Sequence, residues 1–251
     1  MTVVAVLGLG EAGGRLAADL VSAGAEVHGY DPVAPSAPPG VLRTSTPEPA
    51  VAAADAVLSV TSAAAALAAA ARAVPALRPD AVYADLNTAA PALKRELGAL
   101  VPRFADVALL GPVPARGLRT PALASGAGAA AFADALGPLG MPVEIVSAEP
   151  GDAAALKLVR SVFMKGVAAA AIESLDAAEA IGNREWAERQ LAEVIGPELL
   201  ERFVEGSRVH AARRVDEMES ACELLRSLGV EPHVAAASRA LLVKLAEQHR
   251  D

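Results

Sequence analysis

Residues 2–14 read TVVAVLGLGEAGG, and this stretch decides the fold expected for the first half of the chain. It opens with an apolar, β-branched run over residues 2–7, which is typical of a parallel strand buried on both faces. A Gly-x-Gly-x-x-Gly turn follows, and residues 15–23 then have helix-forming character and end before a glycine. The order predicts a strand, a tight turn and a helix. The three glycines of the turn are Gly8, Gly10 and Gly13.

The same stretch has the spacing of a dinucleotide-binding turn. A second expected strand, residues 26–30, ends at Asp31, eighteen residues after the last glycine of the motif. In such a turn the first glycine makes the bend, the second lets the backbone approach a pyrophosphate, and the third allows close helix packing. The helix N-terminus holds the phosphate charge, and the acidic residue accepts hydrogen bonds from the ribose hydroxyls. The residues expected to contact the cofactor here are Gly8, Leu9, Gly10, Glu11, Ala12, Gly13 and Asp31.

Asp31 also bears on which nucleotide binds. Its carboxylate repels a 2′-phosphate and no arginine follows it directly, so NAD is favoured over NADP. Arg43 is the nearest basic residue that would reverse this preference, so NADP stays open. Two plainer interpretations remain: the glycines form an ordinary turn, and Asp31 begins a turn at Pro32.

Strand-like and helix-like segments alternate over the rest of the first half. Residues 32–49 are rich in Pro and Ser and are expected to form a loop around a short strand at 41–44. The alternation predicts a parallel, doubly wound α/β sheet of the Rossmann type. The further expected strands are 56–60, 81–85, 106–110 and 143–146, and the further expected helices are an alanine-rich helix that ends at residue 74 and a helix over 92–100.

Ligands bind such sheets at the carboxyl ends of the strands. Polar or glycine-containing segments follow three of the expected strands, and together they predict one crevice. For each residue taken alone, an ordinary cap or turn residue is the plainer interpretation. The residues expected beside the cofactor are Val60, Thr61 and Asn87, and those expected beside a substrate are Asn87, Thr88, Gly111 and Pro112.

Residues 152–181 predict one long helix, because Asp152 is a good N-cap, no proline interrupts the segment, and Gly182 ends it. Three polar side chains recur at intervals of four residues on an otherwise apolar face. A lysine on such a face is partly desolvated and suited to bind a ligand, whereas the plainer alternative is that it extends to solvent. The polar residues are Lys157, Ser161 and Lys165, and the apolar ones are Leu158, Val162 and Phe163.

All of the chain after residue 181 has helical character, interrupted by glycines and by Pro232. Two domains are therefore expected, a nucleotide-binding Rossmann domain over residues 1–149 and an all-helical domain over residues 150–251, joined by the long helix. The expected helices of the second domain are 184–194, 197–204, 209–227 and 234–248, with breaks at Gly196, Gly206 and Gly229.

Composition limits the classes of function. The chain of 251 residues has a net charge of −8, with 22 Lys and Arg against 30 Asp and Glu, which argues against nucleic-acid or anionic-membrane partners. Cys222 is the only cysteine, so no disulfide within the chain and no metal site are predicted. No signal peptide is recognised, and the uncharged run 56–71 is a poor membrane span. The prediction is a soluble, cytoplasmic protein.

In these motifs the chain resembles the β-hydroxyacid dehydrogenase and 6-phosphogluconate dehydrogenase superfamily, over nearly its whole length. The residues that carry the resemblance are GLGEAGG at 8–14, DLNTAAP at 85–91, FADVALLGPV at 104–113 and Gly151-x5-Lys157. An Arg-Arg-x-x-Glu-Met signature at 213–218 is similar to that of a branch with a short helical C-terminal domain.

The resemblance implies an NAD(P)-dependent oxidoreductase that interconverts a hydroxyl and a carbonyl group on a small, anionic substrate. It implies that Lys157 is the general acid and base, hydrogen-bonded to the substrate oxygen during hydride transfer. It also implies a homodimer formed through the helical domain. The substrate, the direction of reaction and any coupled decarboxylation stay open.

Two departures from the family pattern lie on the substrate side. Ser161 stands where the family usually has asparagine, and Leu110-Gly111-Pro112 replaces Ser-Gly-Gly. Residues of the later helices are candidates to replace the substrate contacts that these departures remove. An arginine there can hold a substrate carboxylate bidentately. These candidates are His210, Arg214 and Glu217, beside a structural or substrate-anchoring Lys165. An exposed ion pair between Arg214 and Glu217 is the plainer interpretation. His28, His233 and His249 show no partner spacing.

Two other functions stay open. Imine reductases resemble this chain in architecture, but they usually carry aspartate or tyrosine where Lys157 stands. The departures at Leu110 and Ser161 are also compatible with a nucleotide-binding sensor or interaction protein that has lost catalysis.

Overall fold

The computed structural model describes residues 1–248, so residues 249–251, including His249, lie outside the described part of the chain. The chain divides into two compact units, Met1–Lys157 and a helical unit that begins at Leu158. The division falls inside helix α7 (Asp152–Ala180), whereas the sequence-based boundary lies before this helix, between residues 149 and 150. The roles assigned to the two domains stay predictions.

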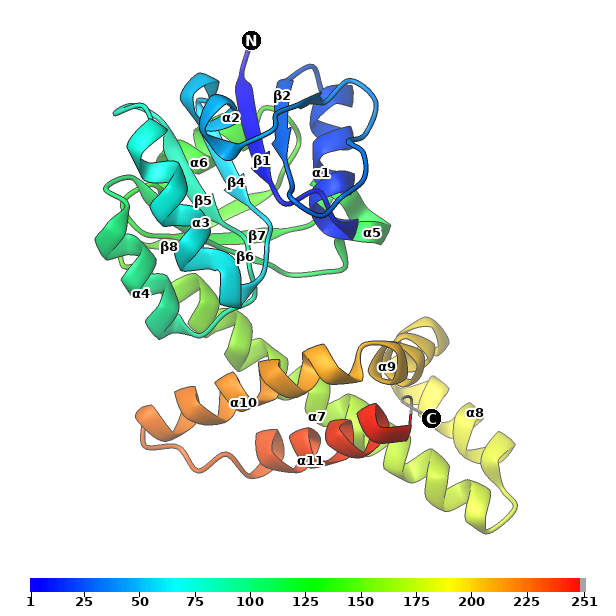
Figure 1. Cartoon of the computed structure of the whole chain (residues 1–251). Helices are drawn as coiled ribbons and strands as arrows, with labels where there is room; N and C mark the ends of the chain where they lie inside the picture. Colours follow the sequence, from blue (N-terminus) through cyan, green and yellow to red (C-terminus); the bar gives the residue numbers. More distant parts are fainter. Residues whose placement is uncertain (249–251) are drawn as a thin grey trace. The chain divides into compact units, whose positions relative to one another are not determined.

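The first unit contains an eight-stranded sheet with the order β3-β2-β1-β4-β5-β6-β7-β8 (Figure 1). Its neighbouring strands are parallel except for β6 and β7, which pair antiparallel. The predicted α/β architecture is confirmed, with this one reversed strand as a correction to an all-parallel sheet. The strands are β1 (Val3–Leu7), β2 (Glu26–Tyr30), β3 (Leu42–Arg43), β4 (Ala56–Ser59), β5 (Val82–Asp85), β6 (Phe104–Leu109), β7 (Ala122–Ser125) and β8 (Val143–Ser147).

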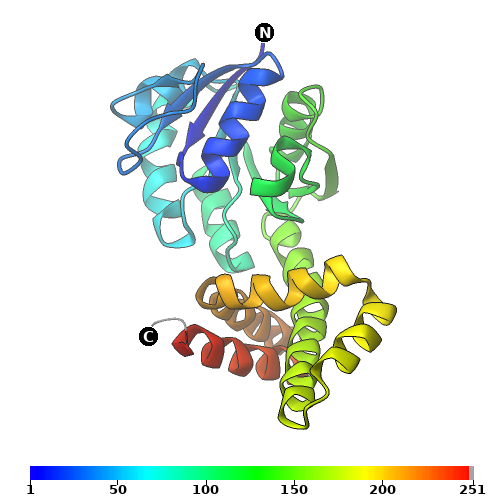
Figure 2. The same ribbon diagram turned by 90° about the vertical axis from the view of Figure 1, so that its right-hand side faces the viewer.

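Helices cover both faces of this sheet (Figure 1 and Figure 2). On one face, Leu16 of α1 and Phe132 of α6 pack in the same apolar cluster as Val6 of β1. On the other face, Leu97 of α4 packs in a second cluster with Leu7 of β1. Successive residues of β1 are thus buried on opposite faces, as its continuous apolar run predicts. The helices are α1 (Glu11–Ser22), α2 (Pro47–Ala53), α3 (Ala66–Ala73), α4 (Pro91–Leu100), α5 (Val113–Arg116) and α6 (Ala129–Leu136).

Several elements differ from those expected from the sequence. Helix α1 begins at Glu11 rather than at residue 15, because Gly10 is itself the N-cap. Helix α2 begins inside the expected loop, with Pro47 in its first turn, where a missing N–H costs nothing. The sequence pattern does not predict β7, α5 or α6. The segment of β7 is alanine-rich and has no β-branched run, and α6 has eight residues and follows a glycine without a capping side chain. Strand β7 follows the short helix α5 instead of a long crossover, so it returns antiparallel.

The described part of the second unit is helical, which confirms the predicted fold class. Its core contains Ile172 and Leu175 of α7, Met218 of α10 and Leu242 of α11. Helices α10 and α11 lie side by side (Figure 1). After α7, the helices are α8 (Arg184–Ile195), α9 (Pro197–Val209), α10 (Ala211–Ser227) and α11 (His233–Gln248). In residues 1–248, no helix combines the length and the apolar character that a bilayer crossing requires.

Two expectations for the helical unit are wrong. Gly206 does not end a helix, because α9 continues to Val209, and a Cβ at Gly206 would lie 2.8 Å from the Arg214 guanidinium. Glycine at this position therefore gives the arginine room.

Phe163 does not lie on the buried face with Leu158, since it is 69% exposed. Five residues correspond to about 140° around a helix, which turns Phe163 away from that face.

Candidate functional site

The glycine turn between β1 and α1 is closed on one side and open on the other. Gly8 has a φ of +98°, a left-handed conformation that favours glycine, and a Cβ there would overlap the Val60 carbonyl group. A Cβ at Gly13 would overlap the carbonyl oxygen of Gly8. At Gly10, in contrast, no described atom outside Gly10 and its two neighbours in the chain lies within 4 Å of the place where a Cβ would be. The turn is therefore open at the glycine where the motif lets a ligand approach.

The N-terminus of α1 is available to an anion. No side chain in the described part of the chain caps this end at Gly10. The N–H of Gly14 donates to the Gly10 carbonyl oxygen at 2.7 Å, so the N–H groups of Glu11, Ala12 and Gly13 precede the first helical hydrogen bond. Donors at the positive end of a helix dipole suit a pyrophosphate. These residues therefore fit the predicted dinucleotide.

Asp31 organises the end of β2. Its carboxylate accepts hydrogen bonds from the backbone N–H groups of Leu9 at 2.7 Å, Val33 at 2.7 Å and Ala34 at 2.8 Å. Partial burial acts to raise the pKa of Asp31, but these bonds and the charge of Arg43 outweigh it, so the pKa lies below its ordinary value of 3.8. Asp31 thus forms the turn of the plainer interpretation and also ties β2 to the glycine turn. Its contact with a ribose stays a prediction.

Arg43 lies beside the same turn. Its guanidinium donates to the carbonyl oxygens of Asp31 at 3.2 Å, Ala34 at 2.7 Å and Pro35 at 3.1 Å. An acidic and a basic side chain are therefore held together at the end of β2. The two groups have opposite preferences for a 2′-phosphate.

The loop after β5 gathers polar side chains from neighbouring strand ends. The side-chain amide of Asn87 donates to Thr61 Oγ1 at 3.3 Å, to Ser59 Oγ at 3.4 Å and to Asp85 Oδ2 at 2.6 Å. The structure thus brings Asn87 and Thr61 together, and Val60 directly precedes Thr61 at the end of β4. Contact of these residues with a cofactor stays a prediction.

Lys157 lies in the second turn of α7, in the first unit. Its Nζ donates to Thr88 Oγ1 at 2.8 Å, which joins α7 to the loop after β5. The candidate general acid and base is therefore hydrogen-bonded to a residue of the candidate substrate loop. A lysine in this position can hold a proton beside an oxygen atom of a bound ligand.

A buried ion cluster lies behind this contact. Lys94 of α4 is 1% exposed, and its Nζ lies 2.6 Å from Asp85 Oδ1 and 3.1 Å from Asp106 Oδ1. Sequence reasoning missed it, although a signal was present. Lys94 lies between Pro91 and Leu97 at intervals of three residues, on the buried face of α4. A lysine on the apolar face of a sheet-covering helix indicates a buried carboxylate partner.

Gly111 and Pro112 follow β6, and Pro112 is the N-cap of α5. The Arg15 guanidinium donates to the Pro114 carbonyl oxygen at 3.0 Å, so α5 is tied to α1. The segment predicted as a substrate loop thus continues into a helix anchored beside the candidate nucleotide-binding helix. Its contact with a substrate stays a prediction.

The helical unit contains a second polar cluster. Ser161 Oγ donates a hydrogen bond to Glu217 Oε1, and Lys165 Nζ lies 2.8 Å from the same oxygen and 3.3 Å from Ser161 Oγ. Burial lowers the pKa of Lys165 below its ordinary value of 10.5, although the charge of Glu217 acts to raise it. Three residues predicted on the substrate side therefore contact one another.

Two further substrate-side candidates lie in the same unit. Arg214 Nη1 donates to Ser207 Oγ at 2.6 Å, and burial lowers the pKa of its guanidinium. The plainer interpretation of Arg214 as an exposed residue on a solvated face is wrong, because its side chain is partly buried over Gly206. His210 is exposed at the junction of α9 and α10. Substrate contact by any of these residues stays a prediction.

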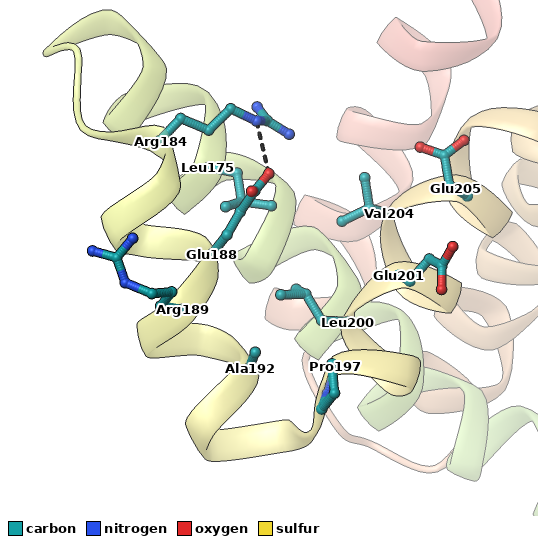
Figure 3. A pocket seen from close by; sticks show the side chains of 10 residues that line it. All are labelled: Leu175, Arg184, Glu188, Arg189, Ala192, Pro197, Leu200, Glu201, Val204 and Glu205. Carbon is teal, nitrogen blue, oxygen red and sulfur yellow. Dashed lines mark hydrogen bonds and ion pairs between the residues drawn. The ribbon is translucent and has the colours of Figure 1, made fainter.

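A cavity of about 410 Å³ lies between α8 and α9 of the helical unit (Figure 3). Its apolar lining includes Leu175, Leu200 and Val204, and an ion pair between Arg184 and Glu188 lies at its edge. The lining contains none of the site residues predicted from the sequence. Among residues 1–248, no group of three or more His, Cys, Asp or Glu side chains is arranged to hold a metal ion.

Two protein-family descriptions match the chain, one in each half. Residues 3–109 match the NAD binding domain of 6-phosphogluconate dehydrogenase. Residues 166–245 match a domain of unknown function, DUF1932. An uncharacterized 28.5 kDa protein of Methanothermus fervidus is 28% identical over 148 residues, which are 57% of this chain and 56% of that protein. The match thus spans about half the length of this curated relative.

Solved structures agree with this assignment. A conserved hypothetical protein from Sinorhizobium meliloti is 32% identical, with 97% of this chain and 88% of that chain covered and a TM-score of 0.75. A conserved protein of unknown function, described as structurally similar to 3-hydroxyacid dehydrogenases, is 30% identical, with 97% and 96% covered and a TM-score of 0.76.

More distant structures share the fold alone. The 3-hydroxyisobutyrate dehydrogenase of Mycobacterium tuberculosis is 20% identical, with 99% of this chain and 95% of that chain covered and a TM-score of 0.81. An imine reductase from Myxococcus stipitatus is 20% identical, with 99% and 95% covered and a TM-score of 0.68. The chain has a hydroxyacid dehydrogenase-like, NAD-binding fold, and it belongs to the 6-phosphogluconate dehydrogenase and 3-hydroxyacid dehydrogenase superfamily, in a branch whose C-terminal half is a DUF1932 domain.

Proposed function

We propose that the protein is an NAD(P)-dependent oxidoreductase of the β-hydroxyacid dehydrogenase type, in which Lys157 is the general acid and base. The observation that carries the proposal is the 2.8 Å hydrogen bond from Lys157 Nζ to Thr88 Oγ1. It joins the candidate catalytic helix to the loop after β5, at the sheet edge where doubly wound folds bind ligands. The reaction interconverts a hydroxyl and a carbonyl group on a small, anionic substrate.

The dinucleotide is held by the glycine turn and by the N-terminus of α1. Gly10 leaves room for the pyrophosphate, and Glu11, Ala12 and Gly13 supply backbone N–H donors. When bound, the nicotinamide supplies the hydride acceptor or donor of the reaction. Asp31 favours NAD, since its carboxylate repels a 2′-phosphate, and Arg43 is the residue that would favour NADP.

Lys157 moves the proton of the reaction. As an ammonium it donates a hydrogen bond to the substrate oxygen, and as an amine it accepts the hydroxyl proton in the oxidative direction. Thr88 holds Nζ in place before substrate binds, and this reduces the side-chain entropy lost in the complex. We place Asn87, Thr88 and the Gly111-Pro112 segment on the substrate side of the same unit.

Further parts of the proposal concern the helical unit. We assign substrate binding to residues of that unit and formation of a homodimer to its helices, as the family resemblance implies. A dimer is tested by light scattering at micromolar concentration, where a monomeric mass contradicts it. The residues assigned to substrate binding are Ser161, Lys165, His210, Arg214 and Glu217.

The test of the function combines binding with turnover. NADH and NADPH are titrated into the protein and followed by nicotinamide fluorescence, alone and with a panel of small hydroxy and keto acids. In Lys157→Met we expect kcat to fall by about a hundredfold or more, as for loss of a general acid–base group, with nucleotide affinity within about twofold of wild type. Lys244→Met, a change at an exposed lysine of α11, is the matched control. Normal turnover by Lys157→Met refutes the assignment.

A second candidate is a nucleotide-binding sensor without catalysis. It is favoured by the mutual hydrogen bonds of Ser161, Lys165 and Glu217, which occupy polar groups otherwise assigned to substrate. Tight nucleotide binding without turnover over the whole acid panel supports this candidate. Reduction of cyclic imines that survives Lys157→Met points instead to imine reductase activity.

A further inference from the structure

The buried ion cluster in the first unit contacts the two segments that meet at Lys157. Lys94 Nζ donates to Asp85 Oδ1 at 2.6 Å and to the Asp85 carbonyl oxygen at 2.8 Å, and it lies 3.1 Å from Asp106 Oδ1. Both carboxylates are fully buried. The cation thus bridges the end of β5 and the third residue of β6 from inside the protein.

The Asp85 side of the cluster holds the loop that carries Thr88. Asp85 is the last residue of β5, and its Oδ2 accepts a hydrogen bond from Asn87 Nδ2 at 2.6 Å. Asn87 immediately precedes Thr88. The backbone of the loop is thereby fixed at both ends, by the strand and by the first turn of α4, in which Lys94 lies.

The Asp106 side holds the N-terminus of α7. Asp106 Oδ2 accepts hydrogen bonds from the N–H groups of Gly151 at 3.1 Å and Ala154 at 3.0 Å. Ser125 Oγ, which lies 3.3 Å from the same carboxylate oxygen, accepts one from the N–H of Ala153 at 3.1 Å. Lys157 follows Ala154 by three residues and so lies above it on the same side of the helix.

The N-terminus of α7 partly offsets the charge of the cluster. One lysine and two aspartates leave one negative charge in the interior, where an uncompensated charge is costly. The helix N-terminus supplies the compensating partial positive charge together with its N–H donors. The cluster therefore favours one register between α7 and the β5 loop.

We propose that Lys94, Asp85 and Asp106 are positioning residues for Lys157: they fix α7 and the β5 loop so that Nζ meets Thr88 before any ligand binds. The inference rests on the proposed function for its effect on catalysis. Its structural part, the placement of Lys157, is measurable without turnover. A cluster that only stabilises the fold would leave the environment of Lys157 unchanged.

Lysine acylation measures this placement directly. The chain has four lysines, of which Lys94 and Lys165 are shielded from water and Lys157 and Lys244 are accessible to reagent. The full-length protein is treated with a water-soluble N-hydroxysuccinimide acetate, and the acylation rate of each lysine is followed by peptide mass spectrometry. Lys244 in α11 is the internal reference.

We expect Lys94→Met to raise the Lys157 acylation rate relative to Lys244 by about fivefold, the shift that accompanies loss of one hydrogen bond. Thr88→Val, which removes the acceptor itself, gives the same rise. Asp106→Asn keeps the side-chain size and one acceptor oxygen but removes the charge, and gives a smaller rise of about twofold to threefold. In Lys94→Met, kcat falls by about tenfold to a hundredfold, while nucleotide affinity stays within about twofold.

Leu20→Ala is the control for stability. Leu20 is fully buried in α1 and its truncation lowers stability in the same unit, but it leaves the Lys157 acylation rate at the wild-type value. If Lys94→Met does not fold, Asp106→Asn decides the question. A Lys157 rate equal to wild type in the folded variants overturns the proposal. Turnover by Lys157→Met refutes the proposed function instead, and leaves the acylation result standing.

Discussion

Lys94 in the first unit and Lys165 in the helical unit are two lysines withdrawn from water beside carboxylates, and they differ in how completely their charge is compensated. The Lys94 side chain is 1% exposed and meets two aspartates that are fully buried. The Lys165 side chain is 16% exposed and meets one carboxylate, Glu217, which is 11% exposed.

This difference in burial and in number of carboxylate partners suits the two lysine clusters to different roles. Two carboxylates and a backbone carbonyl surround Lys94. Removing the lysine therefore leaves two buried carboxylates without their cation. Lys165 has a single carboxylate, and burial lowers its pKa in spite of that partner. The first cluster therefore suits a fixed frame, and the second retains a lysine whose charge responds to its surroundings.

The largest expected effect is on stability in Lys94→Met. Two buried aspartates are then left without their cation, and we expect the free energy of unfolding to fall by about 3–5 kcal/mol. Urea denaturation measures it, with Lys244→Met as a control expected to change stability by less than about 0.5 kcal/mol. A loss below about 1 kcal/mol in Lys94→Met contradicts the distinction between the two lysines.

Glu217→Gln tests the other side of the comparison. We expect a smaller loss of about 1–2 kcal/mol, because the amide still accepts a hydrogen bond and both side chains are less completely buried than those of the Lys94 cluster. The pKa of Lys165 moves further down, since the charge of Glu217 raises it in the wild type.

Because the pKa of Lys165 is lowered by folding, the free energy of unfolding depends on pH in the alkaline range. Between the lowered folded-state pKa of Lys165 and its ordinary value of 10.5, the unfolded chain binds more protons, so stability rises with pH. In Glu217→Gln this window extends to lower pH. Urea unfolding across alkaline pH measures the slope, and the double variant Lys165→Met/Glu217→Gln has lost it. If the free energy of unfolding changes with pH equally in Glu217→Gln and in the double variant, Lys165 is not the group whose protonation causes the change.

Asp31→Asn gives the smallest expected effect, because this carboxylate is only partly buried. We expect a loss of about 1 kcal/mol at neutral pH from weakened hydrogen bonds to the N–H groups of Leu9, Val33 and Ala34. The pKa of Asp31 is lowered by folding, so its stabilisation is present above about pH 3.8 and is lost as pH falls through the folded-state value. Acid unfolding measures the difference, with the exposed Asp134→Asn as control. A variant as stable as wild type near neutral pH contradicts it.

Much of the framework was predictable because it depends on local periodicity and on glycine geometry. The run over residues 2–7, the glycine turn and the proline-free segment after Asp152 each specify an element with few alternatives. Strand β7 was not predictable, because alanine favours helices and the four-residue segment has no β-branched run. Helix α6 was not predictable, because it is short and no capping side chain marks its start.

The α/β fold class, the glycine turn and the helical C-terminal half could be read from the sequence, since they follow from residue type at short spacing. The family was indicated by a resemblance of motifs, which the comparisons with known proteins confirm. The sequence also singled out Lys157. That Lys157 meets Thr88, and that Lys94 joins Asp85 to Asp106 behind them, is known from the folded structure alone. Those contacts link residues far apart in the chain, and which side chains meet there depends on strand order and on the register of α7 against the sheet.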